Sequence, residues 1–208
     1  MKLVSLVSGG IDSTLMSVLA SEQQFQLFPL YINYGQLAYK REWSACQKVH
    51  TLLKLPKPNK VNVQGFGKSI QSGLTTSKMR IREDAFLPGR NSLFLLIAAS
   101  YAYRVGANNV AIGLLTDKNR LFPDQSKAFI ETAEKFINAE LDFEIKILTP
   151  LMNFNKAEVI ELCRAKNITN TYSCHSGNQK PCGKCISCIE INNAHKILKK
   201  NNNGRRRK

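Results

Sequence analysis

The sequence contains no hydrophobic run long enough to cross a membrane. Its longest apolar stretch extends from Leu93 to Ala99, whereas a transmembrane helix needs about 20 such residues. Residues 1–7 include a lysine and a short apolar run, but Ser-Gly-Gly-Ile-Asp follows where the apolar region of a signal peptide would continue. We therefore expect a cytoplasmic protein that has no membrane partner.

Acidic residues are scarce. The chain has 15 Asp and Glu against 30 Lys and Arg, which gives a formal net charge of +15 at pH 7. Residues 199–208 carry six of these positive charges, and without them the charge is still +9. An excess of this size indicates an acidic partner such as nucleic acid, or a polyphosphate substrate. The alternative is a basic protein whose charge has no functional consequence.

Histidine is rare, and the cysteines are unevenly distributed. Four of the six cysteines gather near the carboxyl-terminal end: Cys174, Cys182, Cys185 and Cys188. In a reducing compartment, clustered thiols indicate a metal site rather than disulfides. Their C-x2-C steps predict four thiolate ligands for one structural zinc ion, and an iron–sulfur cluster is the competing interpretation. Because four thiols complete such a site, we interpret His175 as a surface loop residue.

The remaining sequence has the pattern of an α/β protein. Short apolar runs typical of buried parallel strands alternate with segments of helical periodicity. We expect strands at 2–7, 28–33, 61–63, 109–114 and 144–148, and helices at 12–20, 40–53, 91–105, 127–141 and 156–166. Residues 64–87 lack periodicity and are expected to form a mobile loop. The alternation predicts an open doubly wound parallel sheet with helices on both faces.

The carboxyl-terminal end differs in composition from the rest of the chain. We expect an α/β domain at residues 1–170, which is a length that can bury its own core. A zinc-binding segment follows at residues 171–198, and it would fix this end of the chain to the domain. Residues 199–208, rich in Lys, Arg and Asn, are expected to be a disordered basic tail.

Glycine and hydroxyl residues gather between the first strand and the first helix, in Ser8-Gly9-Gly10-Ile11-Asp12-Ser13. Open parallel sheets bind ligands at this edge. The glycines let the backbone approach an anion, the serines offer hydroxyl groups, and the helix directs its first N–H groups to the same point. The loop predicts a phosphate or pyrophosphate site. The alternative is a Gly-Gly turn in which Asp12 or Ser13 caps the helix.

This hexapeptide resembles the S-G-G-x-D-S signature of the PP-loop ATP pyrophosphatases at every fixed position. Further motifs follow in the order found in the 7-cyano-7-deazaguanine synthase family. They are Tyr34-Gly35-Gln36, Pro88-Gly89-Arg90-Asn91, Gly113, Phe122-Pro123-Asp124, Thr149-Pro150-Leu151 with Lys156, and the four cysteines. The resemblance extends over about residues 3–195. It implies an adenine nucleotide alpha hydrolase-like form of the α/β fold.

The resemblance implies a ligase that uses ATP and Mg²⁺ and splits ATP between its α- and β-phosphates. Such enzymes adenylate the carboxylate of 7-carboxy-7-deazaguanine and admit ammonia, which displaces AMP and forms the amide. A second adenylation activates the amide oxygen, and loss of AMP leaves the nitrile of 7-cyano-7-deazaguanine, a precursor of queuosine. We also expect a homodimer.

Roles of individual residues follow from the same resemblance. It implies ATP contacts from Ser8, Gly9, Gly10, Asp12, Ser13, Tyr34 and Gly113, and catalytic roles for Asp12, Ser13 and Lys156, with Asp12 orienting the Mg²⁺. It implies substrate contacts from Gln36, Arg90, Asn91, Asp117 and Asp124, and zinc ligation by Cys174, Cys182, Cys185 and Cys188. Simpler alternatives are a solvated helix start for Lys156, helix capping for Asn91 and Asp124, and core packing for Tyr34.

The sequence departs from the family at two places. Gln125 and Ser126 replace the Cys and Arg of a Tyr-Pro-Asp-Cys-Arg segment, and Leu37 and Ala38 replace an Arg and a His. Exchanged polar pocket residues alter substrate preference. Alternatives are therefore a related defence-system enzyme that joins a deazaguanine to an amine of a protein or nucleic acid, a PP-loop enzyme that modifies tRNA, and a non-catalytic zinc-bearing nucleic-acid binder.

Overall fold

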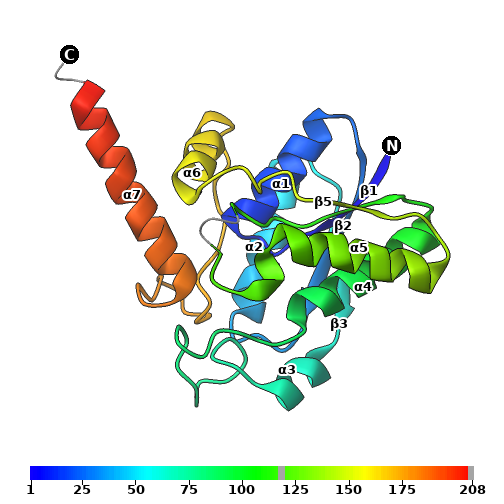
Figure 1. Ribbon diagram of the computed structural model, residues 1–208. Helices are drawn as coiled ribbons and strands as arrows, with labels where there is room; N and C mark the ends of the chain where they lie inside the picture. The colour runs from blue at the N-terminus through cyan, green and yellow to red at the C-terminus, as the bar shows by residue number, and fades with distance from the viewer. Residues whose placement is uncertain (117–119, 206–208) are drawn as a thin grey trace.

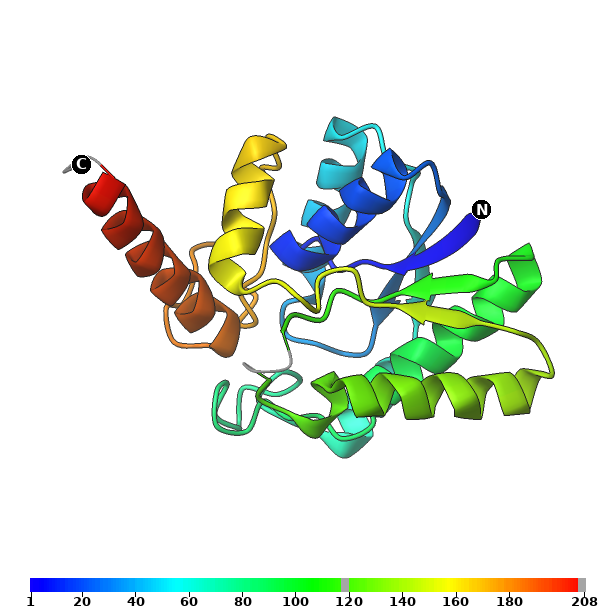
Figure 2. The same ribbon diagram turned by 45° about the horizontal axis from the view of Figure 1, so that its top comes forward.

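The computed structural model describes residues 1–116 and 120–205, so Asp117 lies outside the described residues. Within this part of the chain, five parallel strands form one sheet in the order β3-β2-β1-β4-β5 (Figures 1 and 2). The strands are β1 (Lys2–Leu6), β2 (Gln26–Asn33), β3 (Asn59–Asn62), β4 (Asn109–Ala111) and β5 (Lys146–Leu148). The prediction of an open parallel sheet is confirmed.

Helices connect the strands, as the alternating pattern predicts. They are α1 (Ile11–Glu22), α2 (Tyr39–Leu52), α4 (Arg90–Val105), α5 (Lys127–Leu141) and α6 (Lys156–Ala165), close to the expected bounds. The segment 64–87, expected to be a loop, begins with the short helix α3 (Gln64–Ile70). Its two glycines hide the helical pattern, and a hydrogen bond of 3.0 Å from the Gly67 N–H to the Tyr34 carbonyl fixes it to the end of β2.

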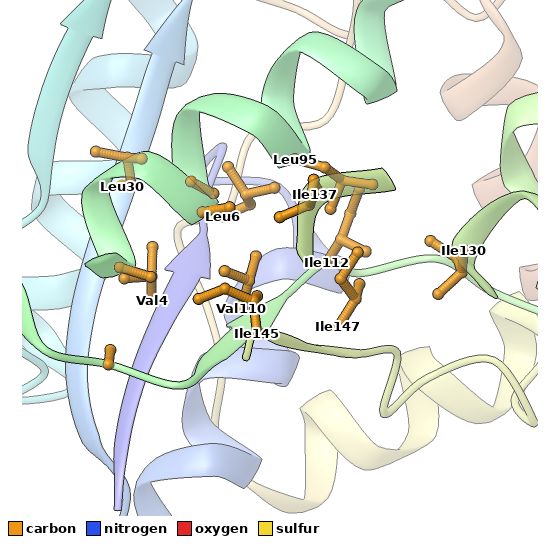
Figure 3. Packing of buried hydrophobic residues seen from close by; sticks show 14 of the residues in the cluster. Val4, Leu6, Leu30, Leu95, Val110, Ile112, Ile130, Ile137, Ile145 and Ile147 are labelled. Carbon is orange, nitrogen blue, oxygen red and sulfur yellow. The ribbon is translucent and has the colours of Figure 1, made fainter. Parts of the chain in front are cut away.

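Side chains of the central strand alternate between the two faces of the sheet. Val4 and Leu6 pack with Leu30 and Val110 on the face covered by α4 and α5 (Figure 3). Leu3 points to the opposite face and packs with residues of α1 and α6. Burial of one such aliphatic side chain contributes about 1.5–3 kcal/mol, so the strands need helices on both sides. This is the doubly wound arrangement.

Residues 199–205, expected to belong to a disordered tail, are helical. Helix α7 (Ile186–Arg205) lies beyond α6 at the edge of the molecule in both views (Figures 1 and 2). Ala194 and Leu198, one helical turn apart, pack on Ala157 and Ile160 of α6. The helix begins at Ile186, ahead of this contact, and no proline interrupts it.

None of the described helices combines the length and apolar character that a membrane-spanning segment requires.

Candidate active site

The Ser-Gly-Gly loop lies where the order of strands reverses. From β1 the chain builds the sheet outwards through β2 and β3 on one side, and later through β4 and β5 on the other. Ligands of open α/β sheets bind at this switch point. Gly113, just beyond β4, closes the gap: a Cβ atom added there would lie 3.4 Å from the Ser13 nitrogen. The structure therefore brings Gly113 against the loop.

Gly9 has a conformation and a packing that other residues do not tolerate. Its φ is +78°, and an added Cβ atom would lie 2.5 Å from the Cys46 nitrogen and 2.7 Å from the Glu42 carbonyl oxygen, both in α2. Its own carbonyl accepts a hydrogen bond of 2.8 Å from the Tyr172 N–H. The backbone is thus clamped between α2 and the segment that leads to the cysteines, which fixes the direction of the loop.

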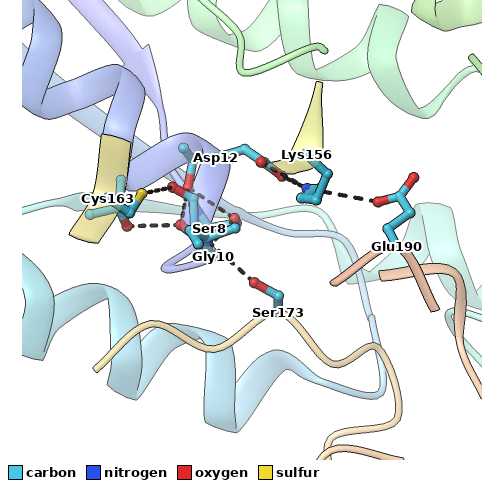
Figure 4. A network of polar contacts seen from close by, with 10 residues as sticks. Ser8, Gly10, Asp12, Lys156, Cys163, Ser173 and Glu190 are labelled. Carbon is cyan, nitrogen blue, oxygen red and sulfur yellow. Dashed lines mark hydrogen bonds and ion pairs between the residues drawn. The ribbon is translucent and has the colours of Figure 1, made fainter. Parts of the chain in front are cut away.

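Hydroxyl groups surround the start of α1 (Figure 4). The Ser13 hydroxyl accepts a hydrogen bond of 3.1 Å from the Ser8 N–H, and the Ser8 hydroxyl accepts one of 3.2 Å from the Gly10 N–H. The Ser173 hydroxyl accepts a hydrogen bond of 3.2 Å from the Ile11 N–H. The N-cap residue is Gly10, which has no side-chain cap, so the alternative of a cap from Asp12 or Ser13 is wrong. These N–H groups are available to an anion that displaces the hydroxyls.

Asp12 and Lys156 form an ion pair beside the loop (Figure 4). The Lys156 Nζ atom lies 2.8 and 2.6 Å from the two Asp12 carboxylate oxygens and 3.7 Å from Glu190 Oε2 in α7. The Lys156 side chain is only 10% exposed, so a solvated helix start does not describe it. Burial raises the pKa of the Glu190 carboxyl, and the Lys156 charge opposes that shift.

A cavity of about 240 Å³, here called the loop cavity, opens above the Ser-Gly-Gly loop. Predicted site residues that line it are Ser8, Gly10, Asp12, Ser13, Tyr34, Gln36, Arg90, Asn91 and Gly113. A larger groove of about 780 Å³ between α6 and α7, here called the helix groove, adjoins it at Asp12 and includes Lys156. Gly9 and Asp124 are not among the residues that line either space.

The wall opposite the loop combines a cation with aromatic rings. The Arg90 guanidinium carbon lies 6.0 Å from the centre of the Tyr34 ring and 5.9 Å from that of Phe94. Asn91, almost fully buried, donates a hydrogen bond of 3.0 Å to the Asp124 main-chain carbonyl. A planar ring and an anionic group can both be bound here.

Glu42 is a cavity residue that sequence reasoning did not single out. Its Oε2 atom accepts hydrogen bonds of 2.9 Å from Gln36 Nε2 and 3.2 Å from the Tyr31 hydroxyl. Burial raises the pKa of this carboxyl, while the bonds from Gln36 and Tyr31 oppose the shift. Gln36 also accepts the Tyr34 N–H at 3.0 Å. The sequence offered one indication of its role, which is that Glu42 is the acidic residue in the first turn of α2, a helix with more basic than acidic residues.

Asp124 and its neighbours build a turn. One Asp124 carboxylate oxygen is buried without a hydrogen-bond partner, and burial raises the pKa of the group. Gln125, which lines the loop cavity, accepts hydrogen bonds from the Leu121 and Phe122 N–H groups at 2.9 and 3.1 Å. Ser126 caps α5 by accepting the Phe129 N–H at 3.1 Å. Gln125 and Ser126, two of the departures from the family sequence, therefore stabilise a local turn beside the cavity.

His175 differs from its sequence-based interpretation. Its side chain lines the loop cavity rather than the outer surface, and its Nδ1 atom is buried without a hydrogen-bond partner. Burial, with the nearby charges of Arg90 and Lys156, lowers the pKa of the imidazole to about 4. The ring is therefore neutral at pH 7.

The four clustered cysteines converge as their spacing predicts. The sulfur atoms of Cys174, Cys182, Cys185 and Cys188 all lie within 4.8 Å of one another. The Cys182 and Cys185 N–H groups donate to the sulfurs of Cys174 and Cys182, each at 3.3 Å. Four sulfurs bound tetrahedrally to one zinc ion at about 2.3 Å would lie about 3.8 Å apart. The donor set and its compactness fit one metal ion.

Comparison with known proteins identifies relatives over almost the whole chain. The family model described as "Queuosine biosynthesis protein QueC" matches residues 2–199. A 7-cyano-7-deazaguanine synthase of Campylobacter concisus is 32% identical over 199 residues, which cover 90% of this chain and 90% of that enzyme. One from Methanobrevibacter smithii is 31% identical over 214 residues, covering 94% of this chain and 93% of the relative.

Solved structures share the fold at low sequence identity. A protein described as a subunit of tRNA methyltransferase from Methanocaldococcus jannaschii superposes with a TM-score of 0.56 at 20% identity, covering 79% of this chain and 74% of that one. The U34-tRNA thiolase NcsA of Methanococcus maripaludis gives 0.51 at 17% identity, covering 97% and 67%. An NMN synthetase of Francisella tularensis gives 0.50 at 15% identity, covering 94% and 84%. These similarities confirm the fold class.

Proposed function

The chain belongs to the QueC family of queuosine biosynthesis proteins, whose members are ATP-dependent C–N ligases, and from that premise we propose that it converts 7-carboxy-7-deazaguanine to 7-cyano-7-deazaguanine with ATP and ammonia. One observation carries the proposal. A glycine loop at the switch point and the Arg90 cation, with its aromatic rings, line the same small cavity. A polyphosphate and a planar acid can therefore meet there.

The loop residues would hold the phosphates of ATP. Ser8, Gly10 and Ser13 offer hydroxyl groups and N–H donors at the positive end of the α1 dipole. Gly9 sets the loop direction, and Tyr34 and Gly113 are expected to contact the nucleotide. Asp12 is the carboxylate expected to hold Mg²⁺, a cation that prefers oxygen ligands and offsets the charge on the pyrophosphate. Lys156 would then exchange its Asp12 partner for a phosphate oxygen.

Arg90, Asn91 and Gln36 would bind the acid substrate on the opposite wall. Its carboxylate oxygen attacks the α-phosphorus, and pyrophosphate leaves. Ammonia then attacks the acyl carbon and displaces AMP, which gives the amide. In a second round the amide oxygen attacks the α-phosphorus of another ATP, and pyrophosphate and one N–H proton leave. The adenylated amide then loses AMP and its remaining N–H proton, which leaves the nitrile.

We propose zinc for the cysteine cluster. Each iron atom of a four-iron cluster binds one thiolate, which keeps the four sulfurs farther apart than ligands of a single ion, and the 4.8 Å limit favours the single ion. Metal analysis of the purified protein, with an absorption spectrum, distinguishes the two. Zinc without visible absorption supports the proposal, and iron with a broad band near 400 nm contradicts it.

A direct assay tests the function. Purified protein is incubated with ATP, Mg²⁺, ammonium and 7-carboxy-7-deazaguanine, and AMP and the base product are followed together by mass spectrometry. We expect two AMP for each nitrile, with the amide as a transient species. Absence of AMP from folded, metal-loaded protein would contradict the proposed function. The same preparation, measured by light scattering, checks the proposed homodimer.

A second candidate function follows from the helix groove. Its 780 Å³ volume adjoins Asp12 and Lys156, and ammonia needs far less space. An amine on a protein or nucleic acid, approaching along α6 and α7, would use the same activated acid. AMP formation without nitrile, together with mass added to a supplied macromolecule, would favour this function over nitrile synthesis.

A further inference from the structure

Consecutive residues connect the Ser-Gly-Gly loop to the cysteine cluster. The Tyr172 N–H donates to the Gly9 carbonyl at 2.8 Å, and the Ser173 hydroxyl accepts the Ile11 N–H at 3.2 Å. Cys174 then belongs to the thiol cluster. The next residue, His175, returns to the loop cavity. The chain thus passes from the cavity to the metal site and back within four residues.

The metal site holds the main chain of His175. His175 directly follows Cys174, one of the four clustered thiols, and the Cys174 sulfur accepts a hydrogen bond of 3.3 Å from the Cys182 N–H. A residue anchored in this way has little freedom to move its backbone. Its imidazole is left facing the cavity, with the Nδ1 atom buried and unpartnered.

The buried and unpartnered Nδ1 atom of His175 indicates that a ligand binds beside it. The great majority of buried side-chain polar atoms in proteins have hydrogen-bond partners, because a buried donor or acceptor without a partner costs about 1–3 kcal/mol. The lining of the cavity combines apolar side chains with polar ones, and His175 shares it with the proposed substrate residues Arg90 and Asn91. Imidazole nitrogens can donate or accept hydrogen bonds, which suits the polar edge of a heterocyclic acid.

The lining residues of the two spaces place the imidazole on the substrate side. His175 and Arg90 line the loop cavity but not the helix groove, whereas Lys156, paired with Asp12, lines the helix groove. The hydroxyl of Ser173, by contrast, lies at the start of α1 where phosphates would bind. The two residues that flank Cys174 therefore serve the two halves of the cavity.

We propose that His175 is a substrate-contacting residue, whose Nδ1 atom hydrogen-bonds the deazaguanine acid, and that the cysteine cluster sets the position of its ring. The proposal rests on the proposed function. It extends that function by giving the metal site a direct part in substrate binding.

Three variants at one position test the contact. An asparagine amide occupies the place of Nδ1 and a glutamine amide that of Nε2, so His175→Asn retains the contact atom and His175→Gln does not. Affinities for ATP and for 7-carboxy-7-deazaguanine are measured separately by calorimetry, with zinc content determined on the same samples. His195→Ala, on α7 and outside the residues that line either space, is the matched control.

We expect His175→Ala and His175→Gln to weaken acid binding about tenfold, and His175→Asn to recover most of it. ATP affinity, zinc content and the control variant should be unchanged. Equal acid affinity in wild type and His175→Ala would overturn the assignment, as would parallel loss of zinc, ATP and acid binding. If wild-type protein binds ATP but not the acid, the proposed function is wrong and the role of His175 falls with it.

Discussion

The Ser-Gly-Gly loop and the cysteine segment are both proposed ligand sites, but they are held by different forces. Strands and helices with apolar cores support the loop, and Gly9 fits against α2 because it has no Cβ atom. The stretch from Tyr172 to Cys185 contains no helix or strand and buries little beyond its thiols. A core fixes the first site, whereas the second would depend on the metal ion proposed for its thiols.

Their difference matters because the two regions touch. Tyr172 and Ser173 hydrogen-bond the loop at Gly9 and Ile11, so the segment that carries the proposed metal site also supports the loop. Variants in each region are expected to show which properties depend on one region alone and which depend on both, from the largest effect to the smallest.

Asp12→Asn should lower AMP formation by about 10²–10³-fold, because the carboxylate that is proposed to hold Mg²⁺ and Lys156 loses its charge. Steady-state AMP release is the measurement. Glu22→Gln is a matched control, since Glu22 pairs with Lys166 at 2.7 and 2.6 Å on the exposed surface. Activity retained by Asp12→Asn would remove Asp12 from the mechanism.

Gly9→Ala should destabilise the fold by about 3 kcal/mol, because the new Cβ atom adds backbone strain and a clash with α2. Urea denaturation measures this change. Gly65→Ala provides the contrast: nothing lies within 4 Å of its added Cβ, and alanine in α3 should be neutral or stabilise the protein by up to about 1 kcal/mol. Equal stabilities of the two variants would contradict the clamped loop.

Cys185→Ser should abolish stoichiometric zinc binding and lower stability by about 2 kcal/mol, since the segment has no core of its own. Elemental analysis and thermal unfolding provide the two readouts. Cys163→Ser, at a buried cysteine outside the cluster, should keep its zinc. Full zinc content in Cys185→Ser would rule out the four-cysteine site.

Ser173→Ala should weaken ATP binding about fivefold, the smallest effect, because one hydroxyl at the start of α1 is lost. Calorimetric titration with ATP and Mg²⁺ detects a change of this size. Ser100→Ala, whose hydroxyl donates to the Leu96 carbonyl on α4, should bind ATP as wild type does. An unchanged affinity in Ser173→Ala would confine the segment to a structural role.

The sequence was sufficient to predict the parts of the molecule that depend on neighbouring residues. Strand and helix periods, the glycine loop and the thiol spacing are local patterns, and each has its expected form in the structure. Helix α7 was missed because Cys188 in its first turn belongs to the predicted metal site and its apolar stripe is short. Its stability depends on α6, which the pattern of α7 alone does not reveal.

The contacts that join the two regions were beyond sequence reasoning. Ser173 meets Ile11 across 162 residues, and Lys156 meets Asp12 across 144. Glu42 and His175 belong to none of the motifs identified in the sequence, and only the folded chain places them in the loop cavity. The roles of Asp124 and the substrate residues stay predictions, since their test requires the acid itself.

The most direct test of the link between the two regions is ATP affinity as metal is withdrawn. A chelator titration followed by calorimetry with ATP and Mg²⁺ gives metal content and the ATP dissociation constant on one sample. We predict that affinity falls in step with metal and returns when zinc is restored, because Tyr172 and Ser173 lose their position. Full ATP affinity in metal-free, folded protein would show that the loop works alone and would contradict the coupling.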